Sequence, residues 1–81
     1  MEKIVIYTDG GSRGNPGPAG AGVAIADSKG NIIKGYSHFL GEKTNNEAEY
    51  EAVIFGLRKI KALLGKEKIK NTEIEFRLDS Q

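Results

Sequence analysis

A chain of 81 residues, 38% of them hydrophobic and 28% charged, has the size and composition of one ordinary globular domain. Twelve Lys and Arg against eleven Asp and Glu give a net charge of +1, which argues against nucleic-acid binding through net charge alone. The lack of cysteine excludes disulfides, thiolate metal sites and a cysteine nucleophile. No signal-peptide or membrane-span pattern is present, so we expect a cytoplasmic protein with no membrane partner.

The first predicted strand covers residues 3–7 and leads directly to an acidic side chain, Asp9. Five glycines and two prolines follow within residues 10–20, and we expect them to end the strand and to prevent a helix. Asp9 would then lie at the rim of a sheet, beside a backbone bare enough for a ligand to approach closely.

Residues 19–26 and 32–40 are the next two strand candidates, and the polar, glycine-containing segment 27–31 joins them as a turn. Two strands joined in this way form a hairpin. Together with the first strand, they predict a three-stranded antiparallel meander.

A helix is predicted next, and its start is marked twice. Thr44 with Glu47, or Asn46 with Glu49, each fits a capping box, and the sequence alone leaves both open. The helix is expected to run to about residue 64, where Gly65 is a suitable stop. Residues 66–71 are predicted to be a basic linker, and residues 72–78 alternate as a half-buried strand that leads into Asp79.

Three glutamates crowd the start of this helix, and a helical projection separates them. Steps of three and four from Glu49 reach Val53, Gly56, Ile60 and Leu63, so Glu49 is predicted to face the sheet. The same steps from Glu47 reach Glu51 and a charged face, so these two are predicted to face solvent. An inward-facing carboxylate is costly unless it is paired or bound to a cation.

The connection through this helix predicts an α/β fold in which a right-handed crossover returns the last strand parallel to the first. Asp9 and Asp79 would then lie at the carboxyl ends of adjacent strands, with Glu49 above them, at the edge where open sheets bind ligands. Oxygen-only ligands of this kind suit Mg²⁺, or Mn²⁺ as the alternative. Two such ions roughly 4 Å apart would support metal-dependent phosphoryl transfer.

The same residues also have simpler interpretations. Asp9 and Asp79, taken singly, are typical turn formers, and Glu49 would be a capping residue if Asn46 were the N-cap. The glycine-rich loop lacks the ending of a P-loop and does not open a helix, so a nucleotide-binding loop is not favoured. Structural roles are favoured for the strand histidine, the aromatic residues and the basic run at the helix end: His38, Tyr7, Tyr36, Phe39, Phe55, Phe76, Lys59, Lys61, Lys66, Lys68 and Lys70.

Three segments resemble the ribonuclease H type 1 family: residues 7–18 (YTDGGSRGNPGP), 44–50 (TNNEAEY) and 78–81 (LDSQ). In order and at fitting separations, they form a specific signature. The resemblance implies a nuclease that hydrolyses the RNA strand of RNA/DNA hybrids and leaves 5′-phosphate and 3′-hydroxyl ends. It also implies that the two metal ions are bound by Asp9, Glu49 and Asp79.

The same resemblance implies a set of substrate contacts. Asn15, Asn45, Asn46 and Gln81 would lie along the minor groove of the hybrid, where polar side chains sense the 2′-hydroxyl. Thr44 would contact a phosphate of the DNA strand. The full set of expected substrate-binding residues is Gly10, Gly11, Ser12, Asn15, Thr44, Asn45, Asn46 and Gln81.

Family members continue beyond the position of Gln81, with a further metal-binding aspartate and a histidine that assists product release. Residues 1–81 are therefore expected to be a single ribonuclease H-like domain that is incomplete at its C-terminus, as in a truncated gene product. The alternative function is a catalytically incompetent fragment that only binds metal or nucleic acid, and a third is a nuclease with another nucleic-acid substrate. The last strand is expected to be an exposed edge through which the chain associates with itself.

Overall fold

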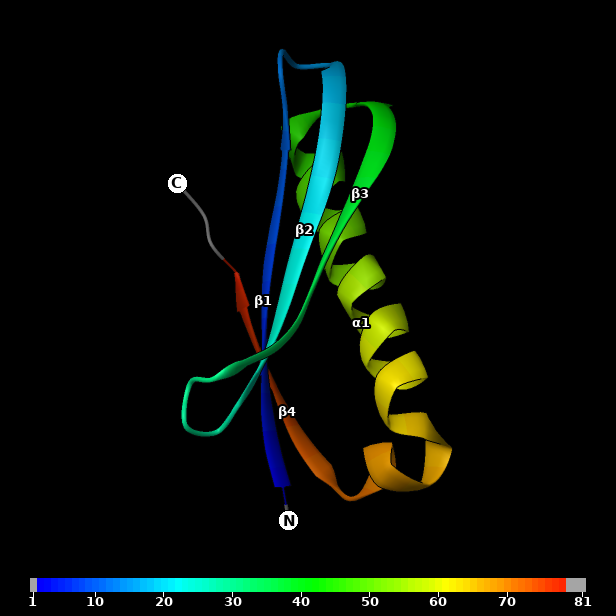
Figure 1. Ribbon diagram of the computed structural model, residues 1–81. Helices are drawn as coiled ribbons and strands as arrows, with labels where there is room; N and C mark the ends of the chain where they lie inside the picture. Colours follow the sequence, from blue (N-terminus) through cyan, green and yellow to red (C-terminus); the bar gives the residue numbers. More distant parts are fainter. Residues whose placement is uncertain (1, 79–81) are drawn as a thin grey trace.

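The fold, given by a computed structural model that describes residues 2–78, is a four-stranded sheet with one long helix against one face (Figure 1). The strand order is β3-β2-β1-β4, with β1 antiparallel to β2 and parallel to β4. The elements are β1 (Glu2–Ser12), β2 (Gly17–Asp27), β3 (Ile32–Lys43), α1 (Asn45–Lys70) and β4 (Thr72–Leu78). The α/β class, the meander, the crossover helix and the parallel last strand are thus confirmed.

Strand β1 is longer than predicted. It continues through Ser12, and Gly10 and Gly11 pair with Ala21 and Gly20 of β2, so the prediction that the glycines end the ladder was wrong. Glycine weakens a strand by entropy, but it keeps its backbone N–H and C=O groups. Here these groups pair with β2, whose residues at these positions also have small side chains or none. The irregular loop shrinks to residues 13–16, and Asp9 lies inside the strand.

The turn between β2 and β3 forms as predicted. The Asp27 carboxylate accepts the backbone N–H groups of Lys29 and Asn31, both at 2.9 Å, and Gly30 takes a positive φ of 89°. These bonds, that of Asn31 first, lower the pKa of Asp27 below its ordinary value. Strands β2 and β3 both extend beyond their predicted ends, and Phe39, which was expected to pack on the sheet, is 71% exposed.

The two candidate starts of the helix are resolved in favour of Thr44. Its hydroxyl accepts the Glu47 N–H at 3.2 Å, and the Glu47 carboxylate accepts the Thr44 N–H at 2.9 Å, which completes the capping box. The backbone N–H of Thr44, and after it the Thr44 hydroxyl, lower the pKa of Glu47 below its ordinary value. At the other end Gly65, at φ 81°, breaks the helical conformation as expected, but residues 66–70 are again helical, so the predicted linker was wrong.

The core lies between α1 and the sheet, and its buried members are Ile4, Ile6, Val23, Ile25 and Ile60. Helix α1 buries a stripe of mostly small residues, Ala48, Ala52, Gly56 and Ile60. The predicted stripe is confirmed at Gly56 and Ile60, whereas its start lies one position earlier than predicted, at Ala48 and Ala52 in place of Glu49 and Val53. Glu49 is exposed and Glu51 is half-buried, because small side chains let the helix backbone approach the sheet along the alanine and glycine positions.

No helix in the described part of the chain has the length and hydrophobicity needed to cross a membrane. The cytoplasmic location and the extent of the domain stay predictions.

Candidate active site

Asp9 lies in β1 next to the point where the described part of β4 ends. The parallel pairing of the two strands runs from Glu2 with Thr72 to Thr8 with Leu78. Ile4, Ile6 and Thr8 are buried, and since side chains alternate along a strand, Asp9 belongs to the opposite face of the sheet. Its side chain is exposed.

Helix α1 meets β1 one residue further along, at Gly10. A Cβ atom placed on Gly10 would lie 2.1 Å from the Ala48 carbonyl oxygen and 2.8 Å from the Glu49 nitrogen, so the helix backbone occupies the space that a side chain would need. Glu49 is exposed on this turn. Asp9 and Glu49 therefore lie on two backbone segments that touch.

The third expected ligand, Asp79, and the expected substrate contact Gln81 lie outside the described residues. Within residues 2–78 no group of three or more His, Asp or Glu side chains is arranged to hold a metal ion. The structure thus brings the segments of Asp9 and Glu49 together, and the complete carboxylate site stays a prediction.

The other glutamates at the helix start have different surroundings. The carboxylate of Glu47 is engaged by the Thr44 N–H, and Glu51 is half-buried. Because Glu47 completes the capping box with Thr44, the alternative in which Glu49 caps the helix from Asn46 is excluded. Glu49 is the exposed glutamate beside the Gly10 contact.

Two asparagines tie the β1–β2 hairpin to the start of α1. The Asn45 side-chain oxygen accepts the Ser12 N–H at 2.9 Å and the Ser12 hydroxyl at 3.3 Å. The Asn15 side-chain oxygen accepts the Asn45 N–H at 3.0 Å. Since backbone N–H groups donate, each amide must present its oxygen to the protein, and its NH₂ group is not used in these bonds.

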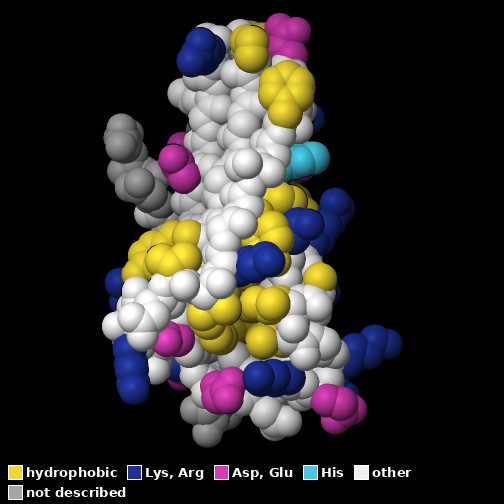
Figure 2. All heavy atoms as spheres, in the orientation of Figure 1, with side chains coloured by type: hydrophobic (Ala, Val, Ile, Leu, Met, Phe, Trp, Pro, Cys, Tyr) yellow, Lys and Arg dark blue, Asp and Glu magenta, His cyan; other side chains and the backbone are white. Residues whose placement is uncertain are grey.

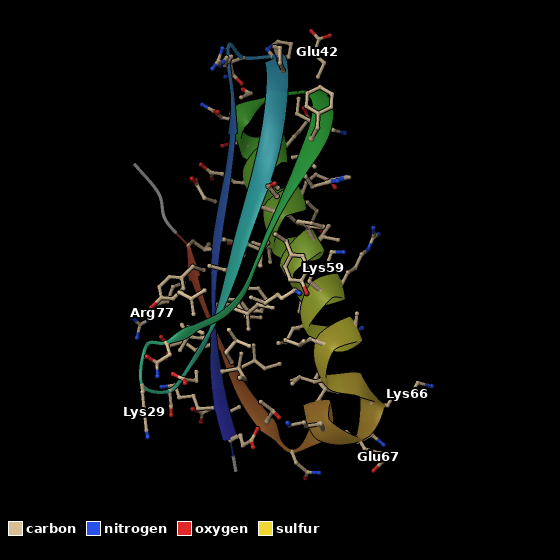
Figure 3. The ribbon with its side chains drawn as sticks, viewed as in Figure 1. Lys29, Glu42, Lys59, Lys66, Glu67 and Arg77 are labelled. Atoms are coloured by element: carbon tan, nitrogen blue, oxygen red, sulfur yellow. The ribbon has the colours of Figure 1, made fainter. Side chains whose placement is uncertain are left out.

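Beside Asp9, the sheet face away from α1 is shallow and poor in side chains. Asp9 pairs with Gly22, and Gly11 with Gly20. In the upper part of the molecule, Figure 2 shows a white band of backbone and other uncoloured atoms, with charged and hydrophobic side chains at its top and margins. Two open hollows of about 440 and 660 Å³ meet at Asp9. The larger one reaches Arg77, whose guanidinium lies 5.8 Å from the centre of the Tyr7 ring and which Figure 3 shows at the outer side of the sheet.

The remaining expected residues lie near the same end of the molecule. Thr44 is half-buried as the N-cap, and Asn46 is exposed on the first turn of α1.

His38 stacks on Phe55, with ring centres 5.1 Å apart, which agrees with the structural role favoured from the sequence. Lys59 reaches from α1 toward β3 over the same aromatic group, 5.3 Å from the centre of the Phe55 ring (Figure 3).

Sequence reasoning missed the structural use of Gly10, Asn15 and Asn45. It assigned them to substrate binding, which stays a prediction, and gave no hint that Gly10 lies against the helix or that the two asparagines lie between hairpin and helix. The bonded residues are 30 and 33 positions apart in sequence, so no local pattern could have revealed the pairing.

Comparisons with known proteins agree with this arrangement. The family model described as RNase H matches residues 1–81. Ribonuclease HI of Halobacterium salinarum is 44% identical over 55 residues, which make up 68% of this chain and 28% of that protein. Ribonuclease H of Erythrobacter litoralis is 38% identical over 81 residues, which make up 100% of this chain and 49% of that protein.

Among solved structures, LC11-RNase H1, isolated from compost by a metagenomic approach, superposes with a TM-score of 0.89 and 53% identity, over 100% of this chain and 56% of that one. LC11-RNase H1 in complex with an RNA/DNA hybrid superposes with a TM-score of 0.85 and 51% identity, over 96% of this chain and 55% of that one. The chain thus spans about half of these structures and 28% and 49% of the two enzymes above. On the family match and these likenesses, the chain belongs to the RNase H family.

Proposed function

We propose that this chain carries the metal-binding part of an endonuclease that hydrolyses the RNA strand of RNA/DNA hybrids. The observation that carries the proposal is the contact of Gly10 with the helix backbone, which holds the exposed carboxylates of Asp9 and Glu49 on adjoining segments. Membership of the RNase H family supports it, as does the likeness to LC11-RNase H1 in complex with an RNA/DNA hybrid.

The proposed metal ligands are Asp9, Glu49 and Asp79. None of the ion pairs among residues 2–78 involves Asp9 or Glu49, so these exposed carboxylates face no competing cation there. Hard oxygen donors of this kind fit Mg²⁺, with Mn²⁺ as the alternative. Asp9, Glu49 and Asp79 would hold such ions, which would supply activation of a water molecule and stabilisation of the leaving oxygen.

Asp79 is proposed from the register of the parallel strands. Thr8 and Leu78 are the last described pair of β1 and β4, and Asp9 and Asp79 are the residues that follow them in sequence. If β4 kept this register, the two carboxylates would be suited to share a ligand at the carboxyl edge of the sheet.

The protein's contacts to substrate are proposed from the hairpin and the helix start. Asn15 and Asn45 use their amide oxygens within the protein, so they would donate from NH₂ to acceptors on the RNA strand, such as the 2′-oxygen. Asn46 and Gln81 are proposed to join them. Gly11 and Ser12 would leave room for the nucleic-acid backbone, whereas Gly10 lies against the helix, and the Thr44 hydroxyl would donate to a phosphate.

Cleavage of a labelled hybrid in Mg²⁺ tests the proposal. Asp9→Asn and Glu49→Gln are expected to lower the cleavage rate by about two orders of magnitude or more, since each removes charge from the reacting centre. Glu51→Gln, on the same helix two residues further on, is the matched control and should keep the activity of the parent chain. Equal activity of Asp9→Asn and the parent chain would refute the nuclease site.

The alternative is a fragment that binds metal or hybrid without turnover, and it is motivated by the chain's spanning about half of its structural relatives. It predicts that the parent chain and Asp9→Asn are equally inert while both still bind the hybrid. Parallel assays on double-stranded RNA and double-stranded DNA distinguish the hybrid nuclease and the inert fragment from a nuclease with another substrate.

We also propose that the outer edge of β4 pairs with a second copy of the chain. In the described sheet β4 is bonded to β1 alone, and Leu78 at its end is 63% exposed. An unpaired strand edge is a template for further pairing. Light scattering should show a mass that rises with protein concentration, and a monomeric mass at all concentrations would contradict the proposal.

A further inference from the structure

We propose that Gly10 is a positioning residue that sets how closely Glu49 approaches Asp9. This inference rests on the proposed metal site formed by those two carboxylates. Gly10 would touch neither the metal nor the substrate in this role; it would act through the backbones that carry the two ligands.

The evidence is the space around Gly10. A Cβ atom there would lie 2.1 Å from the Ala48 carbonyl oxygen, 2.4 Å from its carbonyl carbon and 2.8 Å from the Glu49 nitrogen, all closer than the 3.0 Å that real Cβ atoms keep. These are backbone atoms in the first turns of a capped helix, so they cannot rotate away as a side chain would. The φ angle of Gly10 is not positive. The position therefore requires the absence of a side chain rather than a special backbone conformation.

Gly56 gives a matched contrast on the same interface. A Cβ atom there would lie 3.2 Å from Thr8 Cγ2 and 3.4 Å from Ile6 Cγ2 and from Phe76 Cε1. These neighbours are side-chain atoms at distances that small shifts relieve. An alanine at either position crowds the packing of α1 on β1. Only the alanine at Gly10 would clash with the helix backbone at Ala48 and Glu49, next to the proposed ligands.

The consequence for the site follows from the distances. The shortest contact of an added Cβ atom is the one to the Ala48 carbonyl oxygen. To relieve it, Gly10→Ala must move β1 and the start of α1 apart by roughly 1 Å, which is a large displacement for a site whose groups must be held in place. Both carboxylates remain in the chain, but their separation grows. A metal site should therefore lose affinity without losing a ligand.

The test compares the parent chain with Gly10→Ala, Gly56→Ala and Asp9→Asn. Mn²⁺ affinity is measured by titration calorimetry, and the unfolding midpoint is measured on the same samples. All titrations are repeated in sucrose, which favours the compact state, so that a variant of low stability is still assayed folded.

Gly10→Ala is expected to weaken Mn²⁺ binding about tenfold or more, whereas Gly56→Ala should bind within about twofold of the parent chain even where its midpoint is equally lowered. Parent-like affinity of Gly10→Ala would overturn the inference. So would equal losses of affinity in the two glycine variants, or a Gly10→Ala chain that stays unfolded in sucrose, since Gly10 would then serve the fold as a whole. If the parent chain and Asp9→Asn bind Mn²⁺ equally, the proposed site itself fails.

Discussion

Asn45 has two separable parts, an oxygen that ties the hairpin to the helix and an NH₂ group that is proposed to reach the substrate. Asn45→Ala removes both. Asn45→Asp keeps oxygens that can accept the Ser12 N–H and hydroxyl, now at 2.9 and 3.3 Å, and removes the NH₂ group. The two variants should therefore differ in stability and agree in their loss of hybrid binding.

The expected size of the stability effect follows from the bonds. The backbone bond at 2.9 Å is the better of the two, and losing one such bond costs about 1 kcal/mol. In a domain of this size, 1 kcal/mol lowers the unfolding midpoint by about 4–8 °C. Asn45→Asp should unfold at or slightly above the parent midpoint, because a carboxylate in the first turn of a helix is favourable.

Thermal unfolding by circular dichroism gives the midpoints, and fluorescence anisotropy with a labelled, uncleavable hybrid gives the affinities. Both Asn45 variants should bind the hybrid about tenfold more weakly, which corresponds to roughly 1.4 kcal/mol. Asn46→Ala is the control: Asn46 is exposed, so its replacement should leave the midpoint unchanged.

Two results would refute this reasoning. If Asn45→Ala unfolded at the parent midpoint, the tie between hairpin and helix would contribute nothing to stability. If Asn45→Asp were destabilised as much as Asn45→Ala, the oxygen would not be the group that matters.

Three further predictions concern the core, the cap and the ion. Ile60→Ala should cost about 2–5 kcal/mol in urea unfolding because Ile60 is fully buried, whereas Leu57→Ala on the same helix, at a residue 41% exposed, should cost clearly less. Because the pKa of Glu47 is lowered by folding, its stabilising contribution is complete above its ordinary pKa of 4.5 and is lost as the pH falls through the lower folded value. Between about pH 5 and pH 3, Glu47→Gln should therefore lose less stability than the parent chain. Equal losses in the two chains would contradict this. Mg²⁺ at ten times its dissociation constant should stabilise the parent chain by about 1.4 kcal/mol, EDTA should reverse the effect, and a similar response in Asp9→Asn would argue against binding at that carboxylate.

Much of the fold could be predicted because hydrophobic alternation, turn residues and the capping signal all pointed to the same arrangement. The errors have two physical causes. Gly10 and Gly11 were expected to end β1, but a glycine whose backbone groups are paired can remain in a ladder. Gly65 turns the chain at φ 81°, yet the residues after it return to a helix, and Ile69 packs against the core.

The sequence supplied a set of site residues that stays a prediction, and it predicted their arrangement less well. Glu49 was selected from three glutamates on the argument that it faces the sheet, and that argument was wrong, since Glu49 is exposed. The projection placed Glu49 and Val53 on the interface, whereas the small residues Ala48 and Ala52 lie there. The ties through Asn15 and Asn45 depend on how the hairpin folds back over the helix start, and no sequence period encodes that.

The parallel pairing of β1 with β4 also bears on the order in which the chain folds. Glu2 pairs with Thr72, about 70 residues later, so this pairing closes nearly the whole chain into a loop, whereas β1 and β2 are joined by residues 13–16 alone. Loop-closure entropy favours the local hairpins and the helix as earlier events. Among the five described elements, the docking of β4 is therefore expected to follow the others, so that the β1–β4 pairing beside Asp9 would form late.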